Sequence, residues 1–148
     1  QNIGAKKSER IKSGYFSSIA MITVISAIIL LIVFIFKIPI ISAFLDSESG
    51  QNAIDAGVEY ISITAYCYIF MGLMNCTNGI LRGAGDASFF LLSSLISLGL
   101  RVLIVYSLIG TMGSVIIAWA APISWFASFI FGLIRVLSGK WKNKSLVN

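Results

Sequence analysis

Side chains that could do chemistry are scarce in this sequence, and the few present lie in or beside long apolar runs. The chain of 148 residues has no histidine, six acidic residues and two cysteines. A proton relay or a hydrolase needs a carboxylate or a histidine at its centre, and only Asp55 and Glu59 fall near the edge of an apolar run. The same composition offers neither zinc-ligand spacing nor a disulfide framework. We therefore expect binding rather than catalysis, with no enzyme activity and no metal site.

Arg101 is the charged residue that falls deepest within an apolar run. Placing arginine there costs at least about 2.5 kcal/mol, even on a lenient insertion scale. Ser94, Ser97 and Arg101 follow one another at helical spacing, so one face of their helix is polar. Two interpretations stay open. Arg101 either reaches the membrane interface or the carbonyl groups of a neighbouring helix, or it lines a hydrated pathway.

A matching polar stripe precedes this one in the sequence. It consists of Thr64, Tyr68, Met71 or Gly72, Asn75, Asn78 and Arg82. An amide side chain in hydrocarbon needs a partner, so Asn75 and Asn78 face either another helix or water. Hydrogen bonding between helices is one interpretation, and a cavity that contacts a ligand is the other. The candidate cavity-lining residues of the two stripes are Thr64, Tyr68, Met71, Asn75, Asn78, Ser94, Ser97 and Arg101.

Four apolar segments must position these residues. Hydrophobic residues make up 57% and charged residues 11% of the chain, and its mean hydropathy is +0.93. Such a composition makes lipid the main solvent of the chain. We expect an all-α, polytopic membrane helix bundle with four transmembrane helices at approximately 15–37, 58–81, 88–110 and 113–136. Lys37 and Pro39 are expected to end the first of them.

Two sequence features predict how these helices connect and pack. Arg82-Gly83-Ala84-Gly85-Asp86 offers a cation at a helix end, glycines suited to positive φ and an acid able to cap the next helix. On the last helix, small residues recur on one stripe and predict close packing. Pro122 interrupts that helix and predicts a kink, either static or serving as a hinge. The structural or hinge candidates are Arg82, Gly83, Gly85, Asp86 and Pro122, and the packing stripe is Ser114, Ala118, Ala121, Trp125, Ser128 and Gly132.

The basic residues predict the orientation of the chain, because cytoplasmic loops of membrane proteins are rich in lysine and arginine. Both termini are expected in the cytoplasm, in a multi-pass protein of the plasma membrane. Lipid headgroups account for the net charge of +5, so we expect membrane lipid and not nucleic acid as a partner. The expected outer side holds Lys37, and the expected inner side holds Lys6, Lys7, Arg10, Lys12, Arg82, Arg135, Lys140, Lys142 and Lys144.

Several motifs, taken in their order along the chain, resemble a known family. They are Gln1-Asn-Ile-Gly-Ala5 with Arg10 downstream, Arg82-Gly-Ala-Gly-Asp86, Arg101, Met112-Gly113 and Trp119-Ala-Ala-Pro-Ile-Ser-Trp125. Together they resemble the C-terminal lobe of the multidrug and toxic compound extrusion (MATE) family, over nearly the whole chain.

This resemblance implies a fold and a function. Members of the family have twelve helices in two lobes around a central cavity, and they exchange Na⁺ or H⁺ for organic, often cationic, compounds. The helices here would be the last four of the twelve. The chain would be a fragment, a partial C-terminal lobe made of a cytoplasmic connector (1–14), a four-helix membrane region (15–136) and a basic cytoplasmic tail (137–148). Its partners would be the N-terminal lobe of the same polypeptide and small organic substrates, cationic ones included.

One feature of some family members has no counterpart here. They carry an acidic cation-binding residue in the helix equivalent to 58–81, where this sequence reads Ile69-Phe-Met-Gly-Leu-Met-Asn75. We therefore expect no permanently bound cofactor, and Na⁺ or H⁺ as a coupling ion whose site lies outside this sequence. The leading interpretation is part of a secondary active multidrug/cation antiporter that works by alternating access. The alternatives are a flippase for lipid-linked oligosaccharides with a related fold, a small homodimeric exporter, and a non-transporting membrane subunit.

Overall fold

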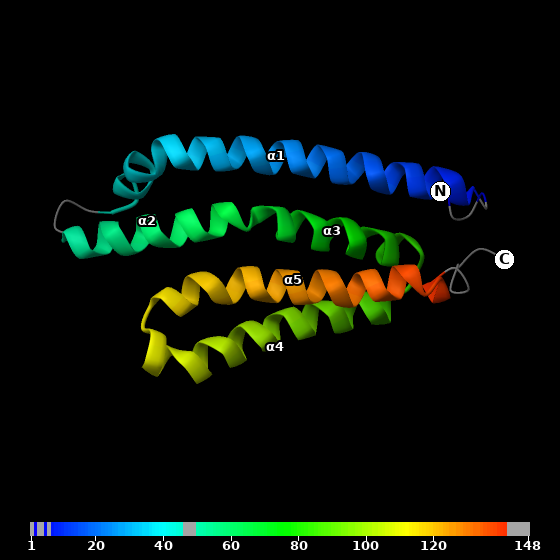
Figure 1. Cartoon of the computed structure of the whole chain (residues 1–148). Helices are drawn as coiled ribbons and strands as arrows, with labels where there is room; N and C mark the ends of the chain where they lie inside the picture. The colour runs from blue at the N-terminus through cyan, green and yellow to red at the C-terminus, as the bar shows by residue number, and fades with distance from the viewer. Residues whose placement is uncertain (1, 3–4, 6, 46–49, 142–148) are drawn as a thin grey trace.

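The chain forms five helices in the computed structural model, which describes residues 2, 5, 7–45 and 50–141 (Figure 1). No strand occurs among the described residues, which confirms the expected all-α class. The predictions for Lys6, Lys142, Lys144 and most of the motif 1–5 fall outside the described residues. The helices are α1 (Ser8–Ser42), α2 (Gln51–Tyr66), α3 (Tyr68–Gly83), α4 (Ala87–Met112) and α5 (Val115–Leu137).

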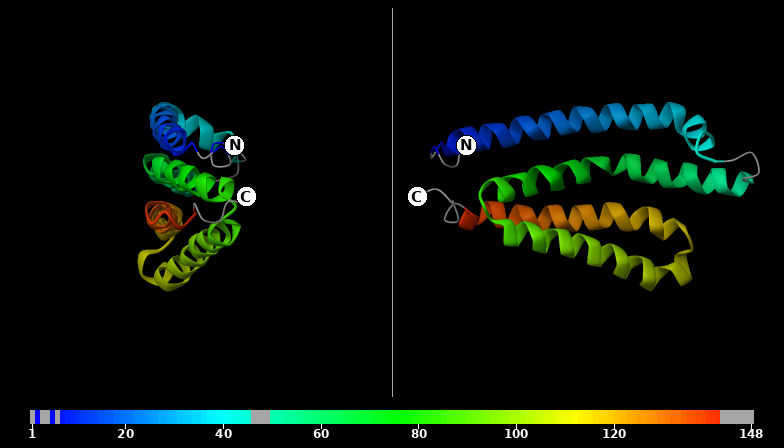
Figure 2. Two further views of the ribbon diagram at one scale, coloured as in Figure 1. Left: turned by 90° about the vertical axis from the view of Figure 1, so that its right-hand side faces the viewer. Right: turned by 180° about the vertical axis from the view of Figure 1, so that it is seen from behind.

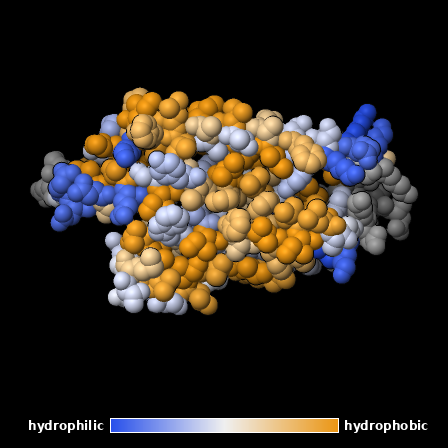
Figure 3. Space-filling view, in the orientation of Figure 1, coloured by the Kyte–Doolittle hydropathy of each residue, from blue (hydrophilic) through white to orange (hydrophobic). Residues whose placement is uncertain are grey.

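The described helices are long and apolar enough to account for three or four membrane spans. α1, α4 and α5 each meet this criterion alone, and α2 with α3 meets it as a pair bent by 48°. Figures 1 and 2 show the helices running side by side, with the start of α1 and the end of α5 at the same end of the bundle. Apolar residues cover much of the face shown in Figure 3, and the most hydrophilic residues gather toward its two ends. This arrangement fits a bundle surrounded by lipid.

The first helix is longer than expected. The prediction that Lys37 and Pro39 end it is wrong, since α1 continues to Ser42 with Pro39 inside it. A proline has no N–H and so removes one hydrogen bond from the helix. The next turn closes nonetheless, because the N–H of Ala43 donates to the carbonyl of Pro39 at 3.1 Å. Figure 1 shows the last turns of α1 leaving the line of the rest of the helix.

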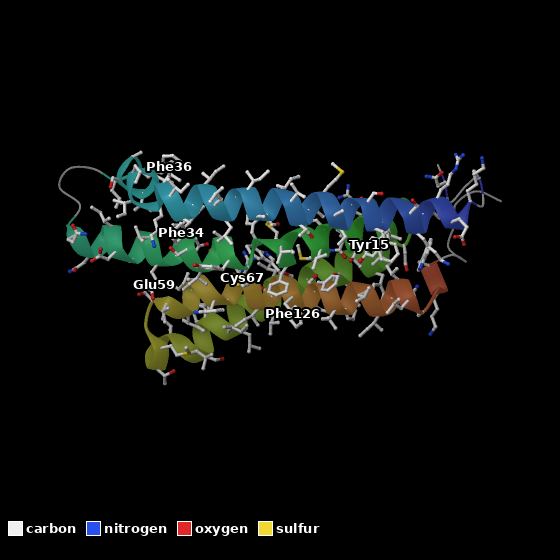
Figure 4. The ribbon with its side chains drawn as sticks, turned by 45° about the horizontal axis from the view of Figure 1, so that its top comes forward. Tyr15, Phe34, Phe36, Glu59, Cys67 and Phe126 are labelled. Atoms are coloured by element: carbon white, nitrogen blue, oxygen red, sulfur yellow. The ribbon has the colours of Figure 1, made fainter. Side chains whose placement is uncertain are left out.

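The second expected helix is broken near its middle. A continuous helix was predicted there, but α2 and α3 meet at Cys67, whose φ of −98° and ψ of 4° are not helical. Neither proline nor glycine marks this point. Just beyond it, the ring of Tyr68 lies edge-on to Trp125 and the ring of Phe70 lies edge-on to Phe126, with centroids 6.4 Å and 5.1 Å apart. Contacts with α5 therefore accompany the bend, which Figure 4 shows at the Cys67 label.

α5 lies at the centre of the bundle and packs against α2, α3 and α4. Across the contact with α4, the hydroxyl oxygens of Ser93 and Ser128 lie 2.7 Å apart, and both residues are fully buried. This pair satisfies two polar groups while the backbones approach closely. The predicted packing stripe is confirmed except at the exposed Ser114, since the structure buries Ala118, Ala121, Trp125, Ser128 and Gly132.

The turn between α3 and α4 is a Schellman motif. Gly85 has a φ of 77°, as predicted, and its N–H donates to the carbonyl of Arg82 at 3.1 Å. The N–H of Asp86 donates to the carbonyl of Leu81 at 2.9 Å, which completes the motif. Gly83 is instead the last residue of α3. Asp86 occupies the N-cap position of α4, as expected, but its side chain makes no capping hydrogen bond to that helix.

α1 lies so close to α3 that there is no room for a side chain at Gly72. A Cβ atom built on Gly72 would lie 2.3 Å from Cγ2 of Ile22. Toward the start of α1, the hydroxyl oxygens of Tyr15 and Thr77 lie 2.9 Å apart and join the same two helices. Figure 4 shows Tyr15 between them.

We expect Gly72→Ala to lower the free energy of unfolding by about 1–3 kcal/mol, because the branched side chain of Ile22 cannot move aside without displacing α1. Thermal unfolding in detergent measures the effect. Gly79→Ala is the matched control, since a Cβ at Gly79 meets nothing within 4 Å and alanine favours a helix by about 0.5–1 kcal/mol over glycine. Adding Ile22→Ala should restore part of the loss. Equal stability of the two alanine variants would contradict the contact.

Candidate functional site

A groove of about 330 Å³ lies between α3 and α4 and is also lined by Trp125 of α5. We call it the polar groove. It contains residues of both polar stripes, so the structure places them around one shared space. Its lining residues are Met74, Asn75, Asn78, Arg82, Phe90, Ser94, Ser97, Leu98, Arg101 and Trp125.

Two asparagine side chains of α3 line the polar groove, one exposed and one buried. Asn75 is exposed, and its Nδ2 donates to the carbonyl of Met71 at 2.9 Å. Asn78 is only 5% exposed. Its Oδ1 is buried and has no hydrogen-bond partner within the described part of the chain. This oxygen lies against α5, since a Cβ built on Gly132 would be 3.3 Å from it. A buried acceptor without a partner costs about 1–3 kcal/mol, so Asn78 needs a hydrogen-bond donor that the described chain does not supply.

The α4 wall carries two hydroxyls and a guanidinium. Ser94 donates to the carbonyl of Phe90 at 3.1 Å, and Ser97 is buried. Arg101 is half-buried, and its Nε lacks a hydrogen-bond partner among the described residues. The described chain thus shows no carbonyl of a neighbouring helix receiving this N–H. Arg101 lines the polar groove, as the pathway interpretation requires, and the choice between the two interpretations stays a prediction.

The polar groove is positively charged. Arg82 and Arg101 both line it, and no carboxylate is among its described lining residues. The guanidinium carbon of Arg82 lies 5.2 Å from the ring centroid of Phe90, a cation–π contact that holds this side chain at the groove. A cleft lined by one sign of charge with apolar walls concentrates ions of the opposite sign.

Three of the predicted lining residues lie outside the polar groove. The prediction placed Thr64, Tyr68 and Met71 on one stripe with Asn75, but the break at Cys67 separates Thr64 from the rest. The ring of Tyr68 packs against Trp125, and Met71 contributes its carbonyl to Asn75. Thr64 has a buried hydroxyl oxygen without a hydrogen-bond partner in the described chain.

Some lining residues had no functional prediction. Trp125 was assigned to helix packing, and it does pack, but it also lines the polar groove. Met74, Phe90 and Leu98 were treated as ordinary apolar residues. Their positions could have been predicted from spacing. Met74 is four residues before Asn78, and Phe90 and Leu98 are four residues on either side of Ser94, and residues three or four apart share one face of a helix.

A second cleft, of about 450 Å³, lies between α1 and α3 near the start of α1. Arg10, Tyr15 and Cys76 are among its lining residues. The hydroxyl of Tyr15 is already paired with Thr77, and none of the described residues that line this cleft has a buried side-chain atom without a hydrogen-bond partner. The smaller polar groove is therefore the better candidate site, because it holds the unsatisfied polar atoms of Asn78 and Arg101.

An ion pair holds the Schellman turn against α5. Nε of Arg135 donates to Oδ2 of Asp86 at 2.8 Å, and the two side chains are 15% and 1% exposed. The guanidinium also lies over the ring of Phe89, 4.9 Å from its centroid. The sequence placed Asp86 at a helix cap and Arg135 at the membrane interface. In the structure, the ion pair joins the turn between α3 and α4 to α5, at the end of the groove where its two walls meet.

Pro122 is buried within α5, which continues on both sides of it. Its missing N–H removes one backbone hydrogen bond. Two residues later, the hydroxyl of Ser124 bonds to the carbonyls of Ala120 and Ala121, at 2.6 Å and 2.9 Å. Such back-bonding often bends helices, and it adds to the kink that a proline favours. The hinge role of Pro122 stays a prediction.

The described residues contain no group of three or more histidine, cysteine, aspartate or glutamate side chains arranged to hold a metal ion. Cys67 and Cys76 are free thiols. The donors available in the polar groove are amides, hydroxyls and guanidinium groups, which suit hydrogen bonding to an organic molecule.

A family model described as MatE matches residues 1–107. The match includes the α3 and α4 residues of the polar groove and ends within α4. No curated protein and no solved structure matches the chain.

Removing Arg135 should destabilise the protein strongly. We expect Arg135→Gln to lower the free energy of unfolding by about 3–5 kcal/mol, because it removes the cation that lies 2.8 Å from a buried carboxylate oxygen. Lys12→Gln removes the exposed pair between Lys12 and Glu9, whose side chains are 67% and 87% exposed, and should change little. Chemical denaturation in detergent compares the two. Similar, small effects of both variants would show that the Asp86–Arg135 pair is not structural.

Proposed function

Because the chain belongs to the MatE family of transporters, we propose that it forms the last four helices of a secondary antiporter, which exports small organic compounds in exchange for Na⁺ or H⁺. The single observation that carries this proposal is the polar groove. It gathers polar residues of two helices around a space that contains unsatisfied buried polar atoms. Such atoms deep in an apolar bundle mark pathways for substrates or ions.

The lining of the polar groove suits a small amphipathic ligand. Trp125, Phe90 and Leu98 supply apolar and aromatic surface, and Asn78 and Arg101 supply hydrogen-bonding groups. Ligand sites in proteins combine a mostly apolar wall with a few polar groups that orient the ligand. Met74 adds a flexible side chain that adapts to different shapes. This combination supports transport of several related compounds.

We propose that transport occurs by alternating access. α4 packs mainly on α5 and touches α3 much less, so the polar groove follows a loose contact between two helices. Rocking of this lobe against the other would expose the groove to each side of the membrane in turn, and the loose contact lets α4 move relative to α3 as it does so. The bend at Cys67 and the proline at Pro122 are the positions on α2–α3 and α5 where such a movement is easiest.

The coupling ion is proposed to bind outside these helices. No carboxylate is among the described lining residues of the polar groove, and α3 carries no acid. Na⁺ prefers oxygen ligands, and H⁺ coupling needs a titratable group. We therefore propose that the site lies in the N-terminal lobe of the same polypeptide, to which these helices form the partial C-terminal lobe.

The chain is part of a multi-pass membrane protein, and we propose that both termini face the cytoplasm at the plasma membrane. Lys7, Arg10 and Lys12 at the start of α1 lie at the same end of the bundle as Lys140 after α5 (Figure 1). Lys37 lies near the other end of α1. This charge asymmetry supports the orientation, because basic loops stay on the cytoplasmic side.

One observation favours a second function. Arg82 and Arg101 without a nearby carboxylate would also suit the phosphate of a lipid-linked sugar, the substrate of a flippase. A flippase would move a lipid-linked fluorescent sugar and leave a water-soluble dye behind, whereas the antiporter would do the opposite.

Transport in proteoliposomes tests the proposed antiport. We expect the protein to move a fluorescent organic dye against its gradient when a Na⁺ or H⁺ gradient is imposed. Asn78→Leu should lower the initial rate by about two- to tenfold, because one hydrogen bond contributes about 0.5–1.5 kcal/mol. Asn52→Leu, the same change at an exposed position at the start of α2, should have no effect. Equal amounts of folded protein are confirmed by size-exclusion chromatography. Absence of dye movement under both gradients would rule out the antiporter.

A further inference from the structure

We propose that the polar groove binds the anionic group of its ligand through Arg101, so that organic acids and zwitterions are favoured over compounds that are only cationic. This inference concerns which substrates bind and rests on the proposed transport function. It follows from the charges, the unsatisfied atoms and the size of the groove.

The charge of the polar groove is the first argument. Its described lining includes two guanidinium groups and no carboxylate. Of the acids elsewhere in the described chain, Asp86 pairs with Arg135 and Glu9 with Lys12, and Asp55 and Glu59 lie on α2, which does not line the groove. A purely cationic ligand at Arg101 would therefore meet a like charge between apolar walls, where repulsion is stronger than in water. A ligand with a carboxylate is instead attracted by the positive charge.

The state of Arg101 is the second argument. Its Nε is buried and has no hydrogen-bond partner among the described residues. Arg82 also lacks an ion pair in the described chain, but it is exposed and its guanidinium lies over Phe90. Arg101 therefore has the greater need of an acceptor. A carboxylate satisfies an arginine best, because two parallel N–H···O bonds match its planar fork.

Asn78 forms part of the opposite wall of the groove. It is 5% exposed, and its Oδ1 lies against α5, since a Cβ built on Gly132 would be 3.3 Å from this oxygen. Arg101 is therefore the group that binds the acid of the ligand, and Asn78 shapes the wall that faces it.

The size of the groove sets the class of ligand. A volume of about 330 Å³ is at the lower end of the range for small-molecule sites. The aromatic rings of Phe90 and Trp125 line it next to the polar groups. The ligand is therefore a small organic acid or zwitterion with an aromatic or otherwise apolar body.

Equilibrium binding of a matched pair of dyes tests this inference on the purified protein. Rhodamine B carries a carboxylate, and its ethyl ester has the same coloured cation without that acid. Fluorescence polarisation in detergent should show the acid binding about tenfold more tightly than the ester, as expected for a charge-assisted hydrogen bond. In Arg101→Gln the two dyes should bind equally, and in Arg101→Lys part of the preference should remain. Lys37→Gln, which removes a cation outside the groove, should leave the preference unchanged.

Three results would overturn the inference. Equal binding of acid and ester to the unmodified protein would show that another carboxylate of the polypeptide already neutralises Arg101. Loss of the preference in Lys37→Gln as well as in Arg101→Gln would show a general charge effect. A preference for the acid that disappears when phosphatidylglycerol, but not phosphatidylcholine, is added would assign the site to a lipid phosphate and also overturn it. Because binding is measured without a gradient, a failure of transport leaves this test unaffected, and a failure here leaves the proposed antiport standing.

Discussion

Polar side chains inside an apolar helix bundle must meet one another or water, and this requirement organises the described chain. Ser93 meets Ser128 between α4 and α5, and Tyr15 meets Thr77 between α1 and α3. Asp86 meets Arg135 where the α3–α4 turn contacts α5. Each of these pairs lies where two helices are in close contact. Asn78 and Arg101 have unsatisfied atoms and line the contact that is left open, which makes the polar groove the place where the bundle accepts an outside partner.

Much of this arrangement follows from periodic patterns that can be recognised in the sequence. Long apolar runs predicted the helices, and small residues every three or four positions predicted that α5 would be buried against its neighbours. Gly85 in a short polar segment predicted the turn between α3 and α4. Asn75, Asn78, Ser97 and Arg101 were placed on stripes of two consecutive helices, and a short turn between them brings such stripes together. These features depend on neighbours close in the chain, and local spacing encodes them.

Other features depend on contacts between distant residues, and no local pattern encodes those. Asp86 and Arg135 are 49 residues apart in the sequence, and each had a plausible role without the other. The bend at Cys67 occurs where neither glycine nor proline stands, and the rings of Tyr68 and Phe70 contact α5 beside it. That bend removes Thr64 from the predicted stripe. Pro39 was expected to end α1. The helix continues to Ser42 nonetheless, because the loss of one backbone hydrogen bond is smaller than the stabilisation from the remaining bonds of the helix.

The central claim is that the polar groove is open to water while the outer face of α4 contacts lipid. It is tested most directly by thiol reactivity in a variant whose Cys67 and Cys76 are replaced by alanine. A cysteine at Ser94, which lines the polar groove, should react in membranes with a charged, water-soluble thiol reagent. A cysteine at its neighbour Leu95, 65% exposed on the apolar surface, should stay unreactive, because neither the reagent nor a thiolate enters hydrocarbon. Reaction at position 95 without reaction at position 94 would contradict the account.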